Sequence, residues 1–231
     1  MRRLFVGRRE IEVLGAVLGM LAATGLGSPD QVSPSSGSPS PRTSEADCPD
    51  VEVVFARGST ESAGLGMVGS PFFEGLRSDL PGRTVASYAV RYEALMDQSS
   101  TADGAADLTR HVIERSGECP LTRFVLGGYS QGASVVDIAT GVVGALGENL
   151  VLPESVLGRV RALVVFGNPL RLTGGQLDTV SGAFQDRSLD LCTPGDPVCA
   201  GGTDPLAHLQ YPRDGSVDRA VRFAVALVLG D

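Results

Sequence analysis

Short apolar runs alternate with amphipathic stretches along most of the chain. The runs are rich in Val, Leu and Phe and are mostly bounded by Gly or Pro, which is typical of buried strands. We expect strands at 51–56, 84–90, 123–129, 160–166 and 188–191, and helices at 72–78, 102–116, 131–146 and 218–229. Strands that alternate with helices form parallel sheets covered on both faces. The pattern therefore predicts an α/β fold, a three-layer α/β/α sandwich around a mostly parallel five-stranded sheet.

The first 47 residues differ in pattern from the rest of the chain. Residues 1–27 combine four early Arg with an uncharged apolar run, which is typical of a secretory signal peptide. The run is shorter than the roughly 20 residues of a membrane-spanning helix, and an uncleaved N-terminal anchor is the alternative. Residues 28–47 are a Ser/Pro-rich tract with few apolar side chains, so we expect a disordered linker. The folded domain is expected at 48–231.

Composition and charge restrict both the partners and the chemistry. The chain has 231 residues, 19 Arg, no Lys, 27 acidic residues and a formal net charge of −8. Because nucleic-acid binding requires clustered cations that displace counterions, we expect no nucleic-acid partner. The chain has 4 Cys and only 2 His, His111 and His208. Any reaction that needs an imidazole must therefore use one of these two side chains.

A serine flanked by glycines is the strongest local sign of chemistry. The segment Gly128-Tyr129-Ser130-Gln131-Gly132 is a G-x-S-x-G motif between an expected strand and an expected helix. This is the context of a nucleophile elbow, a sharp turn that exposes the serine hydroxyl. The turn also brings free N–H groups of the helix N-terminus close to the oxygen that becomes negative during acyl transfer. A glycine-rich turn with an incidental serine is the alternative.

Chain order distinguishes the two histidines as partners for Ser130. A neutral serine needs a general base, and in hydrolases with this elbow the order is serine, acid, histidine. His111 precedes Ser130 within an expected helix, where a surface or half-buried structural role is the simpler interpretation. His208 follows the last expected strand and permits this order, so it is the predicted base. An exposed loop histidine is the alternative.

The third member of such a triad is a carboxylate that orients the imidazole. The candidates between Ser130 and His208 are Asp137, Glu148, Glu154, Asp178, Asp186, Asp190, Asp196 and Asp204. Asp196 lies in the segment CTPGDPVC at 192–199, where two prolines and a disulfide between the flanking cysteines would make the loop rigid. A rigid acid suits a preorganised triad, so Asp196 is predicted and Asp204 is its competitor.

The four cysteines are expected to form two disulfides, although three complete pairings are possible. Cys48 and Cys119 precede two expected strands whose beginnings can be neighbours in a parallel sheet. Cys192 and Cys199 can close the small loop around Asp196, so Cys48–Cys119 with Cys192–Cys199 is the most economical pairing. A secretory signal would supply the oxidising compartment that disulfides require. The alternative, a zinc site built from all four cysteines, lacks paired C-x2-C spacing.

Several motifs taken together resemble the cutinase family of serine esterases, which includes cutinase-like proteins of mycobacteria and related actinobacteria. The matching stretches, in order between 48 and 228, are CPDVEVVFARGSTE (48–61), GLGMVGSPF (64–72), CPLTRFVLGGYSQGASVVD (119–137), FGNP (166–169), CTPGDPVC (192–199) and HLQY (208–211). The resemblance implies the triad Ser130, Asp196 and His208, and both disulfides. It also implies an oxyanion hole formed by the backbone N–H groups of Ser59 and Gln131, with a contribution from the Ser59 hydroxyl.

Two positions qualify this resemblance. Ser59 follows the first expected strand, where a second oxyanion donor is expected, although a turn or helix-cap role is its alternative. Glu93 lies where many relatives have Pro, in a loop near the expected mouth of the site. We therefore expect this loop to affect the acyl-chain preference but not the triad.

These residues predict a secreted serine esterase that hydrolyses short- to medium-chain acyl esters through an acyl-enzyme. No metal or organic cofactor is expected. The expected partner is a small-molecule or lipid ester, with peripheral contact to lipid or the cell envelope, and the protein is expected to be a monomer. One alternative is a lipase or phospholipase that acts on cell-envelope or host lipids. The other is a non-catalytic envelope or antigen-type protein on a hydrolase fold.

Overall fold

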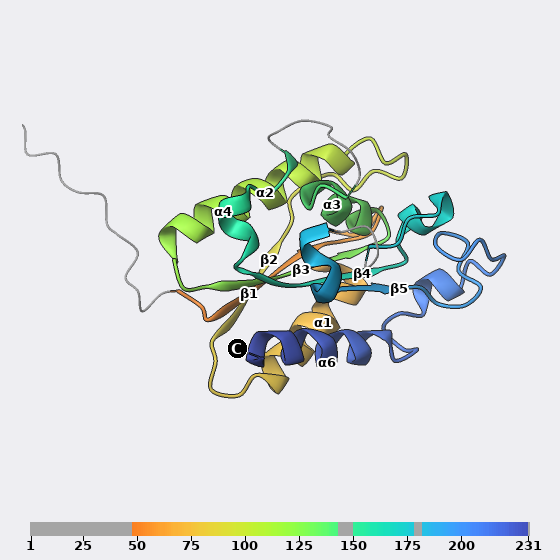
Figure 1. Cartoon of the computed structure of the whole chain (residues 1–231). Helices are drawn as coiled ribbons and strands as arrows, with labels where there is room; N and C mark the ends of the chain where they lie inside the picture. Colours follow the sequence, from red (N-terminus) through yellow and green to blue (C-terminus); the bar gives the residue numbers. More distant parts are fainter. Residues whose placement is uncertain (1–47, 143–149, 178–181, 231) are drawn as a thin grey trace, which may run out of the picture. The chain divides into compact units, whose positions relative to one another are not determined.

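The computed structural model describes residues 48–142, 150–177 and 182–230 (Figure 1). The expected signal peptide at 1–27 and linker at 28–47 lie outside these residues. The elements are, in chain order, β1 (Val51–Ala56), α1 (Gly66–Asp79), β2 (Val85–Ala89), α2 (Thr101–Glu118), β3 (Arg123–Tyr129), α3 (Gln131–Ala139), α4 (Glu154–Leu157), β4 (Val160–Phe166), the 3₁₀ helices η3 (Pro169–Thr173) and η4 (Gly182–Arg187), β5 (Ser188–Leu191), the 3₁₀ helix η5 (Ala207–Leu209) and α6 (Ser216–Leu229). No helix in the described ranges is long and apolar enough to cross a membrane.

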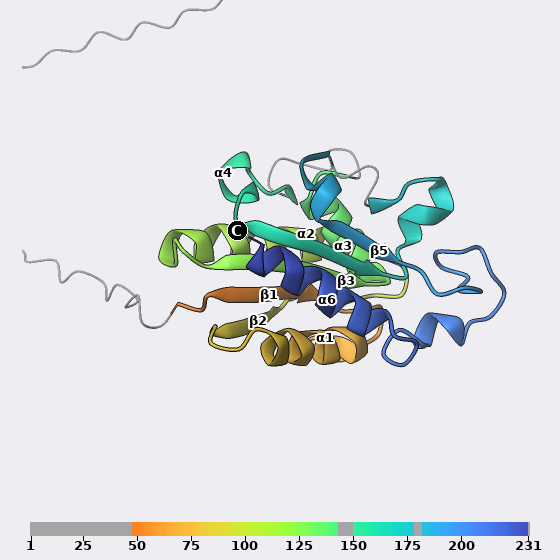
Figure 2. The same cartoon turned by 60° about the horizontal axis from the view of Figure 1, so that its bottom comes forward.

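The strands form one parallel sheet in the order β2-β1-β3-β4-β5. The register places Val53 of β1 between Ser87 of the edge strand β2 and Val125 of the central strand β3. Helices α1 and α6 cover one face, and α2 and α3 cover the other (Figures 1 and 2). The predicted three-layer sandwich with a five-stranded sheet is therefore confirmed.

The alternation of side chains along each strand divides the interior into two cores. In β1, Val53 and Phe55 join the core beneath α1 and α6, whereas Val54 joins the core beneath α2 and α3. All three side chains are fully buried. A parallel sheet buried on both faces has no polar face, which explains why its strands are nearly continuous apolar runs in the sequence.

The carboxyl ends of the parallel strands meet at one edge of the sheet, and the loops that leave this edge carry the candidate site. Ser59 follows β1, Ser130 follows β3, Pro169 follows β4 and Asp196 follows β5. Ligands of open α/β sheets bind outside the carboxyl ends of the strands. The fold therefore gathers residues that are far apart in the sequence.

The helix expected at 131–146 is shorter than predicted, because α3 ends at Ala139. Gly141 adopts a left-handed backbone with a φ of +74°. The N–H of Val142 donates to the carbonyl of Asp137, and the N–H of Gly141 donates to that of Ile138. These two bonds form a Schellman motif, which ends a helix at a left-handed glycine. The expected helical residues 143–146 lie outside the described part of the chain.

Helix α1 begins at Gly66, earlier than the expected start at residue 72. The carboxylate of Glu61 accepts a hydrogen bond of 2.6 Å from the N–H of Met67, in the first turn of the helix. An acidic group at a helix N-terminus satisfies a free N–H and interacts favourably with the helix dipole. Because this cap comes from outside the helix, the apolar periodicity of α1 alone did not reveal where the helix begins.

Candidate active site

Ser130 lies in the sharp turn between β3 and α3. Its φ of 55° and ψ of −117° are rare for a residue with a side chain, which identifies local backbone strain. The flanking glycines permit this turn: a Cβ on Gly128 would lie 2.1 Å from the carbonyl oxygen of Gly132, and a Cβ on Gly132 would lie 1.9 Å from that of Ala56. The spacing of the G-x-S-x-G motif is therefore a steric requirement of the turn.

His208 connects Ser130 to Asp196. Its Nε2 lies 2.9 Å from Oγ of Ser130, and its Nδ1 lies 2.8 Å from Oδ2 of Asp196. The ring stacks on Tyr129, whose hydroxyl donates a 2.7 Å hydrogen bond to the carbonyl of His208. This arrangement allows the Ser130 hydroxyl to donate to Nε2 while Nδ1–H donates to Asp196. The structure thus brings the three sequence-predicted triad residues into one hydrogen-bonded chain.

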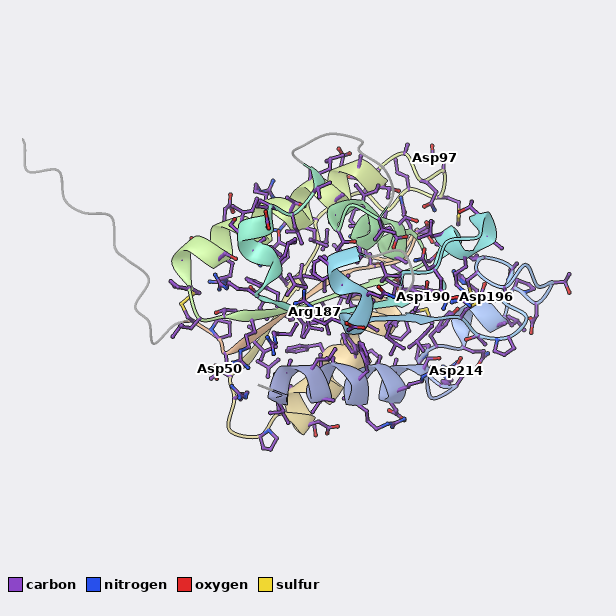
Figure 3. The ribbon with its side chains drawn as sticks, in the orientation of Figure 1. Asp50, Asp97, Arg187, Asp190, Asp196 and Asp214 are labelled. Atoms are coloured by element: carbon purple, nitrogen blue, oxygen red, sulfur yellow. A yellow bond between two sulfur atoms is a disulfide. The ribbon has the colours of Figure 1, made fainter. Side chains whose placement is uncertain are left out.

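Asp196 is fully buried in the loop that follows β5 (Figure 3). Its Oδ1 accepts a 2.7 Å hydrogen bond from the N–H of Val198. Its Oδ2 accepts a 2.6 Å hydrogen bond from the hydroxyl of Tyr211, in addition to the contact with His208. These donors offset the cost of burying a carboxylate. Sequence reasoning did not assign a role to Tyr211, whose only signal was its place in the HLQY motif.

The competing candidates occupy other positions. Asp204 is exposed, and its Oδ1 accepts a hydrogen bond from the N–H of Leu206, which makes it a turn residue rather than a partner of His208. His111 lies in α2, where its ring stacks on Tyr88 and its Nε2 lies 3.2 Å from Oε1 of the buried Glu52. The half-buried structural role expected for His111 matches this placement.

The residues expected to form an oxyanion hole lie beside Ser130. Gln131 is the first residue of α3, so its N–H has no partner within the helix. The N–H of Ser59 has no acceptor among the described residues. Its neighbours do: the N–H of Gly58 donates to the Glu61 carboxylate, and the N–H of Thr60 donates to the carbonyl of Ala94. The Ser59 hydroxyl donates a 3.0 Å hydrogen bond to Oε1 of Gln131. The hydroxyl and the side chain of Gln131 therefore tie the loop after β1 to the start of α3.

The fully buried side chain of Gln131 also connects this loop to α2. Its Nε2 donates to the hydroxyls of Ser100 and Thr101, at 3.3 Å and 3.1 Å, at the N-terminus of α2. Sequence reasoning considered only the backbone N–H of Gln131. Because one amide binds three hydroxyl groups from two other segments, the positions of both candidate oxyanion donors are coupled.

A pocket of about 380 Å³ opens above Ser130. Polar groups of the candidate site and exposed apolar side chains line it together: Ser59, Thr60, Glu61, Met67, Met96, Gln98, Tyr129, Ser130, Pro169, Val198, His208 and Leu209. Pockets of this size accommodate small ligands. Glu93 instead lines a neighbouring groove, so only later residues of its loop, Met96 and Gln98, border the pocket.

Both expected disulfides are present. Cys48–Cys119 joins the segments that precede β1 and β3, with a Cα–Cα distance of 5.5 Å. Cys192–Cys199 closes the loop around Asp196, with a Cα–Cα distance of 5.9 Å. Since all four cysteines are paired, the alternative zinc site has no free thiolate ligands.

A second buried carboxyl group supports the wall of the pocket. Oδ1 of Asp137, in α3, accepts a 3.2 Å hydrogen bond from Nδ2 of Asn168. Oδ1 of Asn168 in turn accepts the N–H of Leu170 and caps η3, whose first residue, Pro169, lines the pocket. The pKa of Asp137 is raised to about 7, mainly by burial and also by the nearby Asp190 carboxylate, while the hydrogen bond from Asn168 acts in the opposite direction. The neutral acid is therefore the form favoured inside the fold below this pH.

Asp137→Asn is expected to remove a pH dependence of stability. Below about pH 4 both folded and unfolded chains hold this proton, whereas between pH 4 and 7 only the folded chain holds it, so stability falls as pH rises. The loss reaches about 4 kcal/mol above pH 7. Urea unfolding between pH 4 and 9 measures it: the variant should gain stability over the wild-type chain only as the pH rises. Parallel curves for the two proteins would contradict this, and the exposed Asp79→Asn provides the control.

Comparison with known proteins gives consistent matches over the folded part of the chain. The family model named Cutinase matches residues 47–228. A cutinase of Kineococcus radiotolerans is 47% identical over 185 residues, which cover 79% of this chain and 63% of that protein, so the chain spans less than two thirds of this relative. Carboxylesterase Culp1 of Mycobacterium tuberculosis is 38% identical over 191 residues (79% of this chain, 84% of that protein). Phospholipase Culp4 of the same organism is 40% identical over 184 residues, which cover 79% of this chain and 80% of that protein.

A solved structure is also similar to the chain. The structure of a Trichoderma reesei cutinase in complex with a phosphonate inhibitor has a TM-score of 0.64 and 32% identity, covering 78% of this chain and 77% of that one.

Proposed function

Since the chain belongs to the cutinase family of carboxylic ester hydrolases, we propose that it is a serine esterase in which Ser130, His208 and Asp196 form the catalytic triad. The observation that carries this proposal is the hydrogen-bonded chain from Oγ of Ser130 through His208 to the buried Asp196. The similar Trichoderma cutinase also supports it, since that enzyme forms a complex with a phosphonate inhibitor.

In the first step of the proposed mechanism, Ser130 attacks the ester carbonyl. His208 accepts the serine proton at Nε2, and Asp196 stabilises the imidazolium through Nδ1. The carbonyl oxygen becomes negative and binds the N–H groups of Ser59 and Gln131. As the tetrahedral intermediate collapses, His208 returns its proton to the alcohol, which leaves, and an acyl-enzyme remains on Ser130.

In the second step, water takes the place of the alcohol. His208 removes a proton from the water as it attacks the acyl carbonyl, and the same N–H groups bind the oxyanion. Collapse of this intermediate returns the proton to Oγ of Ser130 and releases the carboxylic acid. Both steps use the same residues, so the free enzyme is regenerated without a cofactor.

The pocket supports an apolar acyl group as the substrate part beside Ser130. The side chains of Met67, Met96 and Leu209 line the pocket and remain 38%, 70% and 45% exposed. Burial of such side chains against an acyl chain is favourable by about 25 cal/mol per Å² of apolar surface. We therefore propose short- to medium-chain acyl esters as substrates.

A series of p-nitrophenyl esters of increasing acyl length, measured beside the Ser130→Ala variant, tests this function. We expect kcat/KM to rise from acetate to a medium chain and all of this hydrolysis to depend on Ser130. Equal rates for the wild-type chain and the serine variant would contradict the assignment. Failure of the wild-type chain to react with a fluorophosphonate probe would favour the alternative of a non-catalytic envelope protein.

A lipase or phospholipase is the second candidate, supported by the exposed apolar side chains around the pocket and by the similarity to phospholipase Culp4. A preference for aggregated lipid is the distinguishing property. Hydrolysis of a phosphatidylcholine below and above its critical micelle concentration separates the candidates: a lipolytic enzyme should increase in rate when micelles form, whereas a short-chain esterase should show ordinary saturation.

Ser59→Ala is expected to lower kcat, but by less than the roughly 10²–10³ that follows the loss of an oxyanion donor, because the variant keeps the Ser59 N–H and loses only the hydroxyl. The hydroxyl bonds to Oε1 of Gln131, and Nε2 of Gln98 lies 3.3 Å from it, so its removal loosens the loop that holds the Ser59 N–H. Steady-state hydrolysis of p-nitrophenyl butyrate measures kcat and KM separately. A change in KM with unchanged kcat would show that Ser59 acts in substrate binding instead. The exposed Ser70→Ala is the matched control.

We also propose that the protein is secreted after removal of a signal peptide at 1–27, so that the linker at 28–47 precedes the hydrolase domain at 48–231. The signal-like sequence pattern and the two disulfides support this proposal. Expression of the full chain in an actinobacterial host, followed by N-terminal sequencing of the protein in the culture medium, tests it. Retention of an intact N-terminus in the membrane fraction would favour the anchor.

A further inference from the structure

Tyr211 is a fully buried tyrosine that contacts the loop carrying Asp196. It follows η5, three positions after His208, and its ring packs edge-on against Tyr129 and Phe166. Its hydroxyl therefore occupies a fixed place between the hydrophobic core under α1 and α6 and the end of the sheet that carries Ser130. The proposed mechanism does not use this hydroxyl.

The Tyr211 hydroxyl makes contacts at three points of the loop that the Cys192–Cys199 disulfide closes. It donates a 2.6 Å hydrogen bond to Oδ2 of Asp196 and accepts a 3.2 Å bond from the N–H of Thr193. The sulfur of Cys199 lies 3.3 Å away. Burial raises the pKa of Tyr211, and its bond to Asp196 raises it further, so the hydroxyl keeps its proton and donates.

Tyr211 and His208 bind the same carboxylate oxygen, Oδ2 of Asp196. Two donors on one oxygen compete, because each withdraws negative charge that the other would otherwise bind. We propose that Tyr211 is a positioning residue that sets the basicity of His208 by donating a hydrogen bond to Asp196. This inference rests on the proposed triad and adds a fourth side chain to it.

Other titratable groups face this network from the neighbouring elements. Glu61, after β1, and Tyr129, in β3, line the same pocket as His208. Asp204 lies in the loop before η5. Asp214 lies before α6 (Figure 3), and it accepts a hydrogen bond from the Thr193 hydroxyl. Among the described residues, however, the side chains that bind the Asp196 carboxylate are those of Tyr211 and His208. Substitution of Tyr211 does not alter the other titratable side chains, so their effect on His208 should be the same in the wild-type chain and in the variant.

Loss of the Tyr211 hydroxyl should shift the pH dependence of kcat/KM to higher pH. Without the tyrosine donor, the carboxylate holds the protonated imidazole more strongly, so the inactive protonated form of His208 persists to higher pH. The acid limb of the kcat/KM profile should therefore move upward. A hydrogen bond to a charged group is worth enough for a shift of about one pH unit.

Tyr211→Phe tests the proposal with activity and with histidine NMR. We expect the acid limb of kcat/KM to rise by about one pH unit, and the Cε1 proton of His208 to change shift over the same higher range. The two histidines make the assignment simple, since His111→Gln leaves a single imidazole signal. Tyr88→Phe is the matched control, because Tyr88 donates the same kind of bond, 2.9 Å to the buried Asp107, away from the triad.

Replacing Tyr211 with 3-fluorotyrosine keeps the ring and the hydroxyl and provides an independent test that does not depend on the stability of the Phe variant. Fluorine beside the hydroxyl makes it a stronger donor, so the acid limb and the NMR midpoint should move downward. Shifts in opposite directions for the two variants support the proposal. Unchanged midpoints in folded 3-fluorotyrosine protein overturn it, and this outcome differs from failure of the proposed function, which would appear as hydrolysis that does not depend on Ser130.

Discussion

Ser130→Ala is expected to lower kcat for p-nitrophenyl butyrate by about 10⁶, as when the nucleophile of a complete triad is removed. The variant keeps the Cβ and the backbone of the turn, so the strained conformation and the packing of Gly128 and Gly132 remain. It loses only the oxygen that lies 2.9 Å from Nε2 of His208. A residual rate of about 10³–10⁴ times that of the uncatalysed reaction in water should remain, because the proposed oxyanion donors are still present in the variant.

The measurement needs proof that the variant is folded and that the nucleophile is Ser130. Thermal unfolding should give the same melting temperature within a few degrees, and Ser70→Ala, in the exposed part of α1, should retain full activity. A fluorophosphonate should add one adduct to the wild-type chain, on the peptide that contains Ser130, and none to the variant. Retention of even a tenth of the wild-type kcat would show that another residue attacks the ester.

The elements that the sequence predicted well are those fixed by local sterics and burial. The strands are short apolar runs because both faces of the sheet are covered, and the elbow is readable because Gly128 and Gly132 must lack a Cβ. The pairing of Cys192 with Cys199 was also local, since the loop between them is short. Such features depend on residues close together in the chain.

The features that the sequence did not reveal depend on contacts between distant segments. The amide of Gln131 reaches hydroxyls at the start of α2, and the carboxylate of Glu61 caps α1 from outside the helix. Tyr211 gains its role only because the fold brings its hydroxyl to Asp196. The periodicity of apolar residues indicates which face of a helix or strand is buried. It does not indicate which polar group of a distant segment will contact that face. The early end of α3 is a different case, since Gly141 was visible in the sequence and its left-handed conformation is a known helix stop.

Asp196→Asn is expected to lower kcat by about 10⁴. The substitution replaces one of the two acceptor oxygens of the carboxylate with an NH₂ group, which donates. Among the described residues, the groups that bind the Asp196 carboxylate are all donors: the N–H of Val198 at Oδ1, and the Tyr211 hydroxyl and His208 at Oδ2. An asparagine side chain offers one acceptor and one NH₂ donor. Whichever way it turns, its NH₂ therefore meets at least one donor.

The orientation of the new amide decides the outcome. The N–H of Val198 is fixed by the backbone of the disulfide-closed loop and cannot become an acceptor. The Tyr211 hydroxyl can rotate, and the imidazole can change tautomer, so the NH₂ should turn toward these two. His208 would then accept at Nδ1 and carry its proton at Nε2, which leaves it unable to accept the proton of Ser130.

Asp204→Asn is the matched control and also decides between the two acids that chain order alone left as competitors. Among the described residues, the Asp204 side chain accepts the N–H of Leu206 through Oδ1, a bond that an asparagine oxygen can also accept. We therefore expect kcat to stay within about twofold, in line with a surface substitution. Both variants are measured with p-nitrophenyl butyrate at the plateau of the pH profile. A loss of similar size in both, or a larger loss at Asp204, would contradict the assignment of Asp196, because the two residues differ in burial and in contact with His208 but not in chemistry.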